Sequence, residues 1–264
     1  MTSTSTLAGA AETHAAERVM LRGLFDTAVA SVSAARVMPR ALPPPQHGRV
    51  GLIAVGKAAA AMADVALDRM GSPKAALVVS RHGHMIDSLA GRAGVELIEA
   101  GHPYPDSNSI RAAERALEIA HGLGAQDHLV VLLSGGGSAL LAAPAHGINL
   151  ADKQATTRAL LESGATIAEI NCVRKHLSRI KGGRLALAAG PASVTTFIIS
   201  DVPGDDPSFV SSGPTVADHT TLEMAREILR KYGIPTPTAI LPRSTIQRTR
   251  HLLRTVSASR ASKL

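Results

Sequence analysis

The chain has 264 residues, of which 45% are hydrophobic and 2% aromatic, and it contains a single cysteine, Cys172. One cysteine excludes an internal disulfide and a cysteine-based metal cluster. The formal net charge of +7 comes almost wholly from residues 241–264, because the rest of the chain has 22 basic against 21 acidic residues. A nearly neutral body with few aromatic residues excludes a nucleic-acid-binding surface. No apolar run nears the ~18 residues of a membrane span, so we expect no membrane partner.

The two ends of the chain bear on where the protein resides. The N-terminus lacks the basic and then apolar order of a signal peptide, and a single cysteine is typical of a reducing compartment. We therefore expect a cytoplasmic protein. The last three residues, Ser262, Lys263 and Leu264, spell a peroxisomal signal. A match of three residues is weak, so signal and coincidence both stay open.

The N-terminal half predicts helices and buried strands in turn. We assign residues 1–16 to a disordered N-terminus that gives way to an alanine-rich helix over about 14–36. Three prolines at 43–45 then predict a linker, since proline can neither continue a helix nor pair in a sheet. The next predicted elements are strands over 50–55, 75–79 and 95–98 and helices over 58–70 and 107–121.

The C-terminal half continues the alternation. It predicts strands over 130–133 and 194–200, and helices over 150–163, 167–180 and 222–232. Strands that are apolar on both faces and alternate with helices indicate a mostly parallel sheet covered on both sides. Ligands of such sheets bind outside the carboxyl ends of the strands, so the residues that follow each strand are the candidate site residues.

The first strand is followed by Gly56 and Lys57. Residues 51–57 formally match the phosphate-loop pattern GxxxxGK, but the four intervening residues are the strand itself, and Ala58 stands where that pattern needs Ser or Thr. What remains is a lysine at a helix start, where exposed N–H groups and the helix dipole favour an anion. A solvated surface lysine is an equally good interpretation of the position.

The fourth strand is followed by Ser134, three glycines at 135–137, and Ser138. Glycines permit backbone conformations in which several N–H groups point into one concavity, and a phosphate is the natural occupant. The alternative is a flexible turn without a ligand; we favour the anion site because the triplet joins a buried strand to an apolar helix. The pattern is not GxGxxG, which disfavours a dinucleotide.

Two further stretches carry charged residues. Asp201, Asp205 and Asp206 follow the fifth strand and predict a magnesium site, although acidic turns are also common on plain surfaces. Asn171, Arg174 and Lys175 share a helix face by their spacing, which suits an anionic ligand or simply a solvated face. Cys172 is expected to be a packed thiol. His102, in a proline-rich turn, either contacts substrate or closes the loop.

Five stretches of the sequence, taken in order, resemble motifs of the glycerate 2-kinase family, whose members are also named hydroxypyruvate reductases. They read GKAAAAMA, GHPYPDSNS, LLSGGGSALL, INCVRKHLSRIKGGRLA and ISDVPGDDPSFVSSGPT. The resemblance covers residues 17–240 and implies a Rossmann-like, three-layer α/β/α N-terminal domain. It further implies phosphorylation of D-glycerate to 2-phosphoglycerate with ATP and Mg²⁺, although the choice between D- and L-glycerate stays open.

The resemblance also implies roles for particular residues. Lys57 would be catalytic and would stabilise charge on the transferred phosphoryl group. Asp201 and Asp206 would face magnesium. The residues implied for phosphate or substrate binding are Gly56, Ser134, Gly135, Gly136, Gly137, Ser138, Asn171, Arg174, Lys175 and Lys181.

The sequence departs from the family after residue 240. Family members are longer and supply a catalytic arginine from a smaller C-terminal domain, which we expect to be absent here. Residues 241–264 lack acidic residues and the alternation of a strand, and we interpret them as a basic tail of truncated or frameshifted origin. Three functions stay open: a glycerate 2-kinase, active or inactive without its second domain; a hydroxypyruvate reductase; and a noncatalytic nucleotide- or phosphate-binding remnant. A homodimer or a separate C-terminal-domain chain are further possible partners.

Overall fold

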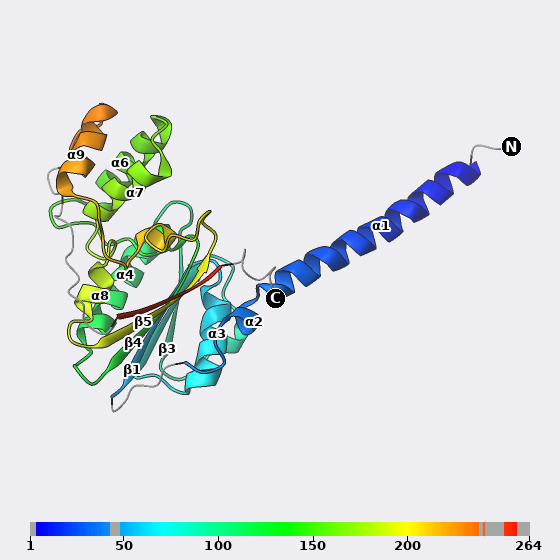
Figure 1. The fold of residues 1–264 in the computed structure, drawn as a ribbon, viewed down its shortest axis with the longest axis horizontal. Coiled ribbons are helices and arrows are strands. Elements are labelled where there is room, and N and C mark those ends of the chain that lie inside the picture. The colour runs from blue at the N-terminus through cyan, green and yellow to red at the C-terminus, as the bar shows by residue number, and fades with distance from the viewer. Residues whose placement is uncertain (1–3, 43–47, 238–239, 241–250, 258–264) are drawn as a thin grey trace.

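A six-stranded parallel sheet forms the centre of the protein (Figure 1). The computed structural model describes residues 4–42, 48–237, 240 and 251–257. The strand order is β3-β2-β1-β4-β5-β6, and every neighbouring pair runs parallel. The strands are β1 (Val50–Val55), β2 (Ala75–Arg81), β3 (Val95–Ala100), β4 (His128–Ser134), β5 (Ser193–Ser200) and β6 (His251–Ser257).

Helices cover both faces of the sheet and make it the middle layer of three. On one face α4 (Ser107–His121) packs with α5 (Gly137–Leu140) and α8 (Arg184–Ala188). On the other lie α2 (Ala34–Val37) and α3 (Ala59–Met70). Within β1, Ile53 belongs to the first core and Leu52 to the second, which explains why the strand is apolar throughout. The predicted Rossmann-like three-layer α/β/α fold is confirmed.

A third group of helices stands apart from the sheet (Figure 1). It consists of α6 (Leu150–Glu162), α7 (Ile167–His176) and α9 (Leu222–Lys231), and its buried centre includes Leu160, Cys172 and Leu229. Cys172 is the packed core thiol that the sequence predicts, and burial raises the pKa of its thiol. The group is therefore a satellite core that places α6 and α7 beside the loops of the sheet.

Two expectations about the ends of the chain are corrected. Helix α1 (Thr4–Ser31) already begins within the segment that we assigned to disorder, because its alanine-rich sequence contains no proline, and it projects from the body (Figure 1). Leu24 and Phe25 on this helix are 60% and 67% exposed. In the C-terminal tail, β6 pairs with β5 although no strand was expected there. Alternation of polar and apolar residues does not reveal β6, because strands of a parallel sheet need not alternate in this way.

The predicted helix over 167–180 ends earlier than expected. Helix α7 stops at His176, because Ser178 forms an isolated antiparallel bridge with Pro144. Two short 3₁₀ helices, η1 (Asp87–Leu89) and η2 (Val210–Ser212), complete the elements of the described residues. Within the part of the chain that the structure describes, no helix has the length and apolarity to cross a membrane.

The strand order fixes where a ligand is expected to bind. Strand β1 pairs with β2 on one side and with β4 on the other, so the connections run in opposite directions from this point of the sheet. In open parallel sheets, the crevice at such a reversal is the usual ligand site. The loops that leave β1 and β4 begin with Gly56-Lys57 and Gly135-Gly136-Gly137. The fold therefore brings together the two turns that the sequence singled out.

Candidate active site

The loops after β1 and β4 are bonded to each other. The backbone N–H of Lys57 donates to the carbonyl of Gly135 at 2.8 Å, and the N–H of Ala58 donates to Ser134 Oγ at 2.9 Å. The side chain of Ser134 thus satisfies a free N–H at the start of α3, a position that helices leave without an internal partner. Ser134 and Gly56 shape the two turns, and the hydroxyl of Ser134 is already engaged.

The glycines of the second turn are required by their close neighbours. A Cβ on Gly135 would overlap the carboxylate of Asp201, and a Cβ on Gly137 would overlap the hydroxyl of Ser211. Gly136 has a φ of 90°, which other residues rarely adopt, and a Cβ there would lie 3.0 Å from His102 Nε2. The triplet therefore lets three other segments of the chain approach the turn closely.

Charged groups flank the glycine turn. Lys57 Nζ lies 3.4 Å from Asp201 Oδ2, and both side chains remain about half exposed, at 48% and 53%. His102 lies against Gly136, and partial burial together with the charges of Lys57 and Arg81 lowers the pKa of its imidazole. A partly exposed ion pair contributes little to stability, so Lys57 and Asp201 can each give up this contact and bind a ligand instead.

A cavity of about 260 Å³ opens beside this turn, and we call it the switch-point cavity. Lys57 contacts two of its lining residues, Gly135 through the backbone and Asp201 through the ion pair. The polar residues and glycines that line the switch-point cavity are His102, Gly135, Gly136, Ser138, Asn171, Arg174, Asp201 and Ser211. Predicted site residues that follow β4 and β5 thus line one cavity, and Lys57, which follows β1, contacts that lining.

Two serines of η2 are hydrogen-bonded to segments that line the cavity. Ser211 and Ser212 both have positive φ values, 54° and 59°, which are uncommon for residues with a side chain. Ser211 Oγ donates to the carbonyl of Ser134 at 3.0 Å. Ser212 Oγ lies 2.5 Å from Ser138 Oγ and donates to Asn171 Oδ1 at 3.1 Å. Hydrogen bonds to the glycine turn and to α7 therefore hold an unfavourable backbone in place.

Lys181 has a structural role that cannot be read from its position in the sequence. It is 1% exposed, and its Nζ donates to the carbonyls of Ser138 at 2.8 Å and Leu141 at 3.0 Å. Burial, reinforced by the charges of Lys153 and Arg174, lowers its pKa well below the usual value. Lys181 thus fixes the segment after the glycine turn.

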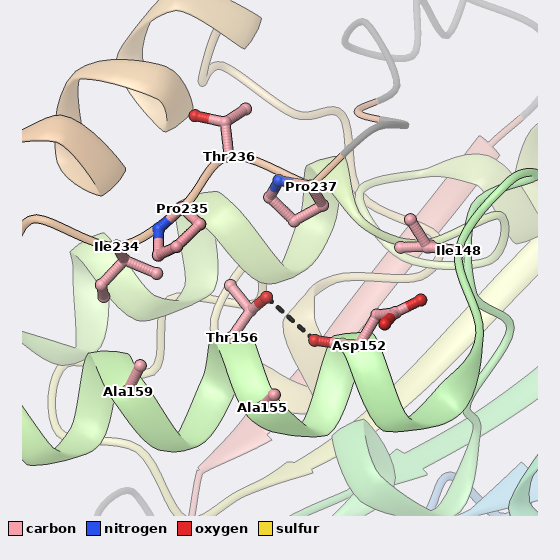
Figure 2. Close-up of a pocket in the computed structure, with 9 residues that line it drawn as sticks. All are labelled: Ile148, Asp152, Ala155, Thr156, Ala159, Ile234, Pro235, Thr236 and Pro237. Atoms are coloured by element: carbon pink, nitrogen blue, oxygen red, sulfur yellow. Dashed lines mark hydrogen bonds between the residues drawn. The ribbon is translucent and has the colours of Figure 1, made fainter.

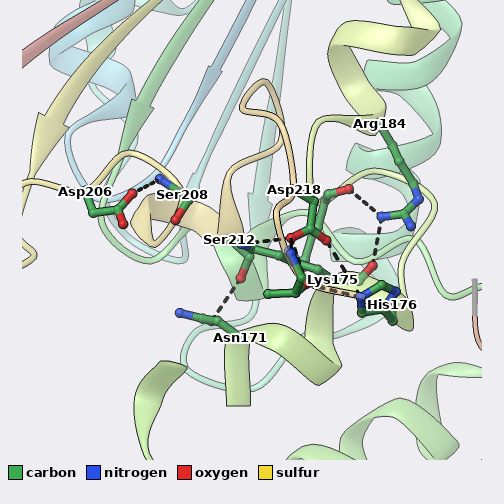
Figure 3. Close-up of polar contacts among 10 residues, drawn as sticks. Asn171, Lys175, His176, Arg184, Asp206, Ser208, Ser212 and Asp218 are labelled. Carbon is green, nitrogen blue, oxygen red and sulfur yellow. Dashed lines mark hydrogen bonds and ion pairs between the residues drawn. The ribbon is translucent and has the colours of Figure 1, made fainter. Parts of the chain in front are cut away.

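Lys175 and Asp206 are not placed at the switch-point cavity. Lys175 Nζ lies 3.4 Å from Asp218 Oδ1, and both side chains are buried (Figure 3). Asp206 accepts a hydrogen bond from the N–H of Ser208 at 2.8 Å, within its own turn. Both residues line a different cavity of about 320 Å³, which we call the Asp206 cavity. Helical spacing groups Lys175 with Arg174, but consecutive residues diverge by about 100° around a helix, and Lys175 turns toward Asp218.

The proposed metal ligands are separated by this arrangement. Asp201 lines the switch-point cavity and Asp206 lines the Asp206 cavity. The described residues contain no cluster of three or more His, Cys, Asp or Glu side chains that could hold a metal ion. Mg²⁺ usually takes one or two carboxylates and completes its shell with water and phosphate oxygens, so Asp201 alone fits that donor set.

Sequence patterns do not indicate Lys153 as a site residue. This lysine lies in α6, is 5% exposed, and lines a cavity of about 350 Å³ together with Arg174 and Lys181; we call it the basic cavity. A lysine within a polar helix sequence looks solvated, and only the packing of α6 reveals otherwise. The opposite side of α6 walls a further cavity, lined mainly by small and apolar residues and bearing Asp152 and Thr156 (Figure 2).

A family model described as Domain of unknown function (DUF4147) matches residues 20–244. The chain belongs to this family. It is 44% identical over 222 residues to D-glycerate 2-kinase of Thermotoga maritima, covering 82% of this chain and 52% of that protein. It is 51% identical over 222 residues to an Agrobacterium vitis protein provisionally named hydroxypyruvate reductase, covering 83% of this chain and 50% of that protein. The chain spans about half the length of these relatives.

Solved structures agree with the sequence comparison. The crystal structure of glycerate kinase from Thermotoga maritima superposes with a TM-score of 0.78 at 38% identity and covers 88% of this chain and 56% of that one. The resemblance to the glycerate kinase family is thus confirmed, and the matched part is the N-terminal region that the motifs indicated. In this DUF4147 chain the matched region includes every site residue described above.

Proposed function

We propose that this chain carries the phosphate-handling part of a glycerate 2-kinase, which transfers the terminal phosphoryl group of ATP to the C2 hydroxyl of glycerate. The observation that carries the proposal is the meeting of Lys57, the glycine turn and Asp201 at the switch point of the sheet. Relatives named glycerate kinase and a glycerate kinase structure support the same reaction. D-glycerate is the proposed substrate, because the Thermotoga maritima relative is named for it.

Phosphoryl transfer sets clear demands on these residues. The bond between the terminal phosphorus and its bridging oxygen breaks, and ADP leaves with that oxygen. A bond from phosphorus to the C2 oxygen forms, and the proton of the hydroxyl is released to solvent. Catalysis rests largely on positioning and on neutralising charge at the transferred group. Lys57 brings an ammonium group to the turn, and the glycine turn brings backbone N–H groups beside it. Both features favour phosphate oxygens over neutral groups.

Magnesium fits this proposal through a single protein ligand. Asp201 would hold the ion, because its exposed carboxylate lies next to the glycine turn, whereas Asp206 faces the Asp206 cavity. When bound, Mg²⁺ would supply positive charge that offsets the negative charge of the phosphate groups. Lys57 and Asp201 would then separate, each turning from its present partner toward the nucleotide.

The name of the Agrobacterium vitis relative favours a second candidate, reduction of hydroxypyruvate. A reductase of that kind needs a dinucleotide site, whose usual fingerprint is GxGxxG between the first strand and its helix. Here β1 is followed by Gly56, Lys57 and Ala58, and the bulky lysine occupies the turn. We therefore rank the kinase above the reductase.

Two parallel assays on the full chain test the proposal. The first supplies D-glycerate, ATP and Mg²⁺ and detects the product by ³¹P NMR, which separates a phosphate ester at C2 from one at C3. The second supplies hydroxypyruvate and NADH and follows absorbance. We expect 2-phosphoglycerate or, if the chain needs a second half for turnover, binding of Mg·ATP that depends on Lys57. NADH oxidation that requires hydroxypyruvate, or a complete failure to bind Mg·ATP, would overturn the proposal.

A further inference from the structure

The basic cavity adjoins the switch-point cavity. The two share four lining residues, Pro103, Ser138, Ala139 and Arg174. The volume of the basic cavity, about 350 Å³, falls within the range of small-molecule sites, which is roughly 300–1,000 Å³. A molecule whose one end lies at the glycine turn can therefore extend along Ser138 and Arg174 into the basic cavity.

Lys153 is an unusual residue to find in the lining of a cavity. Its side chain is almost wholly buried, and its Nζ has no hydrogen-bond partner in the described part of the protein. A buried ammonium that makes no hydrogen bond is strongly unfavourable, and most buried polar groups are paired. The structure thus holds a polar group at the cavity whose partner is not part of the described chain.

The charges around Lys153 all have the same sign. Arg174, from α7, and Lys181 line the cavity with it, and no acidic residue is among the described lining residues. Arg174 has no ion pair or hydrogen bond within the described residues, whereas nearby Arg179 is paired with Glu114 at 3.5 Å. Lys181 already donates to two carbonyls, and its pKa is lowered well below the usual value, so it is not counted as a further charged partner. An anion would satisfy Lys153 and Arg174 together.

The remaining wall combines apolar residues with two neutral polar ones, Gln154 and Thr157. Tyr104, Pro105 and Leu161 line it, and the guanidinium of Arg158 lies 6.0 Å from the centre of the Tyr104 ring. A cavity that joins a cationic wall to a mostly apolar one is suited to an organic anion rather than to a bare inorganic ion. The charged end of such a ligand belongs against Lys153 and Arg174, and its carbon or ring atoms belong against the apolar wall.

We propose that the basic cavity binds a carboxylate or phosphate group of a reactant whose reacting end lies in the switch-point cavity, with Lys153 and Arg174 as its charged partners. The inference rests on the proposed function, because that function places a reacting end beside Lys57. Two sources offer this chemistry, the carboxylate of glycerate and the phosphates of the nucleotide. Both are organic oxyanions, and the experiment below distinguishes them.

Proton uptake gives this binding a distinct signature. Burial, with the charges of Arg174 and Arg179, lowers the pKa of Lys153 to about 7, so the lysine is largely neutral at pH 8. An oxyanion placed beside it favours the charged form and raises the pKa. Binding at pH 8 is therefore expected to take up as much as one proton from solution, which a merely structural lysine does not do.

The test is isothermal titration calorimetry of the full chain at pH 8 in two buffers of different ionisation enthalpy. Mg·ADP, D-glycerate and inorganic phosphate are titrated separately. Lys153→Met removes the charge and keeps the length, Lys153→Arg keeps a charge that cannot titrate, and Lys74→Met removes an exposed lysine near the amino ends of the strands. Lys57→Ala is measured alongside and reports on the proposed function.

We expect proton uptake with Mg·ADP or with D-glycerate, and the one that shows it is the ligand of the basic cavity. Lys153→Met should weaken that ligand at least tenfold and abolish the uptake, whereas Lys153→Arg should keep binding without uptake and Lys74→Met should match the wild type. Unchanged affinity and uptake in Lys153→Met would overturn the inference while leaving a Lys57-dependent nucleotide site intact. Lys153-dependent binding of inorganic phosphate alone would overturn it as well, because no reactant would then occupy the cavity.

Discussion

Replacing Lys153 by methionine should alter how the stability of the protein depends on pH. In the folded state the pKa of Lys153 is lowered to about 7, from an ordinary value of 10.5, by burial and by neighbouring Arg174 and Arg179. Between these two values the unfolded chain binds a proton that the folded chain does not. The free energy of unfolding therefore rises with pH across this window. Below pH 7 the lysine is charged in the folded state too, and the full cost of burying that charge lowers the stability.

The magnitude follows from the size of the shift. Each pH unit within the window changes the free energy by up to about 1.4 kcal/mol, so the wild type should gain about 2–3 kcal/mol between pH 7 and pH 9 through this group. Methionine has no charge to bury, so Lys153→Met should lack this gain and be the more stable protein at pH 7. Replacing an unpaired buried charge by an apolar group of similar size is often stabilising.

Urea unfolding of both proteins at several pH values between 6.5 and 9.5 measures the effect. The difference between the two curves isolates Lys153 from every other titrating group. Lys74→Met is the matched control, because Lys74 is exposed and donates only to the carbonyl of Gly122, so its curve should run parallel to that of the wild type. Parallel curves for Lys153→Met and the wild type would refute the reasoning, since Lys153 would then carry no shifted pKa.

Three further predictions concern the framework of the site. Asp218→Asn should lower the free energy of unfolding by about 3–5 kcal/mol in urea, because it leaves buried Lys175 without its charged partner; a loss below 1 kcal/mol would contradict the buried pair. Gly137→Ala should cost about 1–3 kcal/mol, because its methyl group meets Ser211, and adding Ser211→Gly should recover part of that loss; additive losses would disprove the contact. Lys57→Ala should abolish any phosphoryl transfer and leave the melting temperature within a few degrees of the wild type, because its side chain is half exposed; undiminished turnover would exclude a catalytic Lys57.

The sequence predicted the sheet well because its strands are buried on both faces. Apolar runs such as residues 50–55 leave little choice of structure, and β1 has the predicted bounds. Helix α4 also has the predicted bounds, since Asp106 caps its start by accepting a hydrogen bond from the N–H of Ser109. These elements are set by local patterns, which a sequence displays directly.

The two glycine-bearing turns were also predictable, because of one general rule. The carboxyl ends of parallel strands lie at one edge, so Lys57 and the glycines at 135–137 had to lie at the same edge if the sheet was parallel. Their actual contact, from the N–H of Lys57 to the carbonyl of Gly135, depends on β1 pairing directly with β4. That pairing is a property of the strand order, which the sequence does not display.

The rest of the site depends on tertiary packing. Lys175 and Arg174 are neighbours in sequence, yet one pairs with Asp218 and the other lines the two cavities beside the glycine turn. Lys153 is buried because α6 and α7 pack together in the satellite core, and nothing in its own segment predicts this. Side chains that acquire their partners from distant segments are therefore the ones that sequence patterns assign wrongly or miss.

The most direct test of the central claim is the affinity of the full chain for Mg·ADP, measured by calorimetry for the wild type, Lys57→Ala and Lys74→Ala. If the turns after β1 and β4 form one phosphate site, Lys57→Ala should weaken binding about tenfold or more, as expected for loss of a charged hydrogen-bond donor worth about 1.5–3 kcal/mol, and Lys74→Ala should bind like the wild type. Equal affinity of Lys57→Ala and the wild type would contradict the account, because the phosphates would then lie away from the switch point of the sheet.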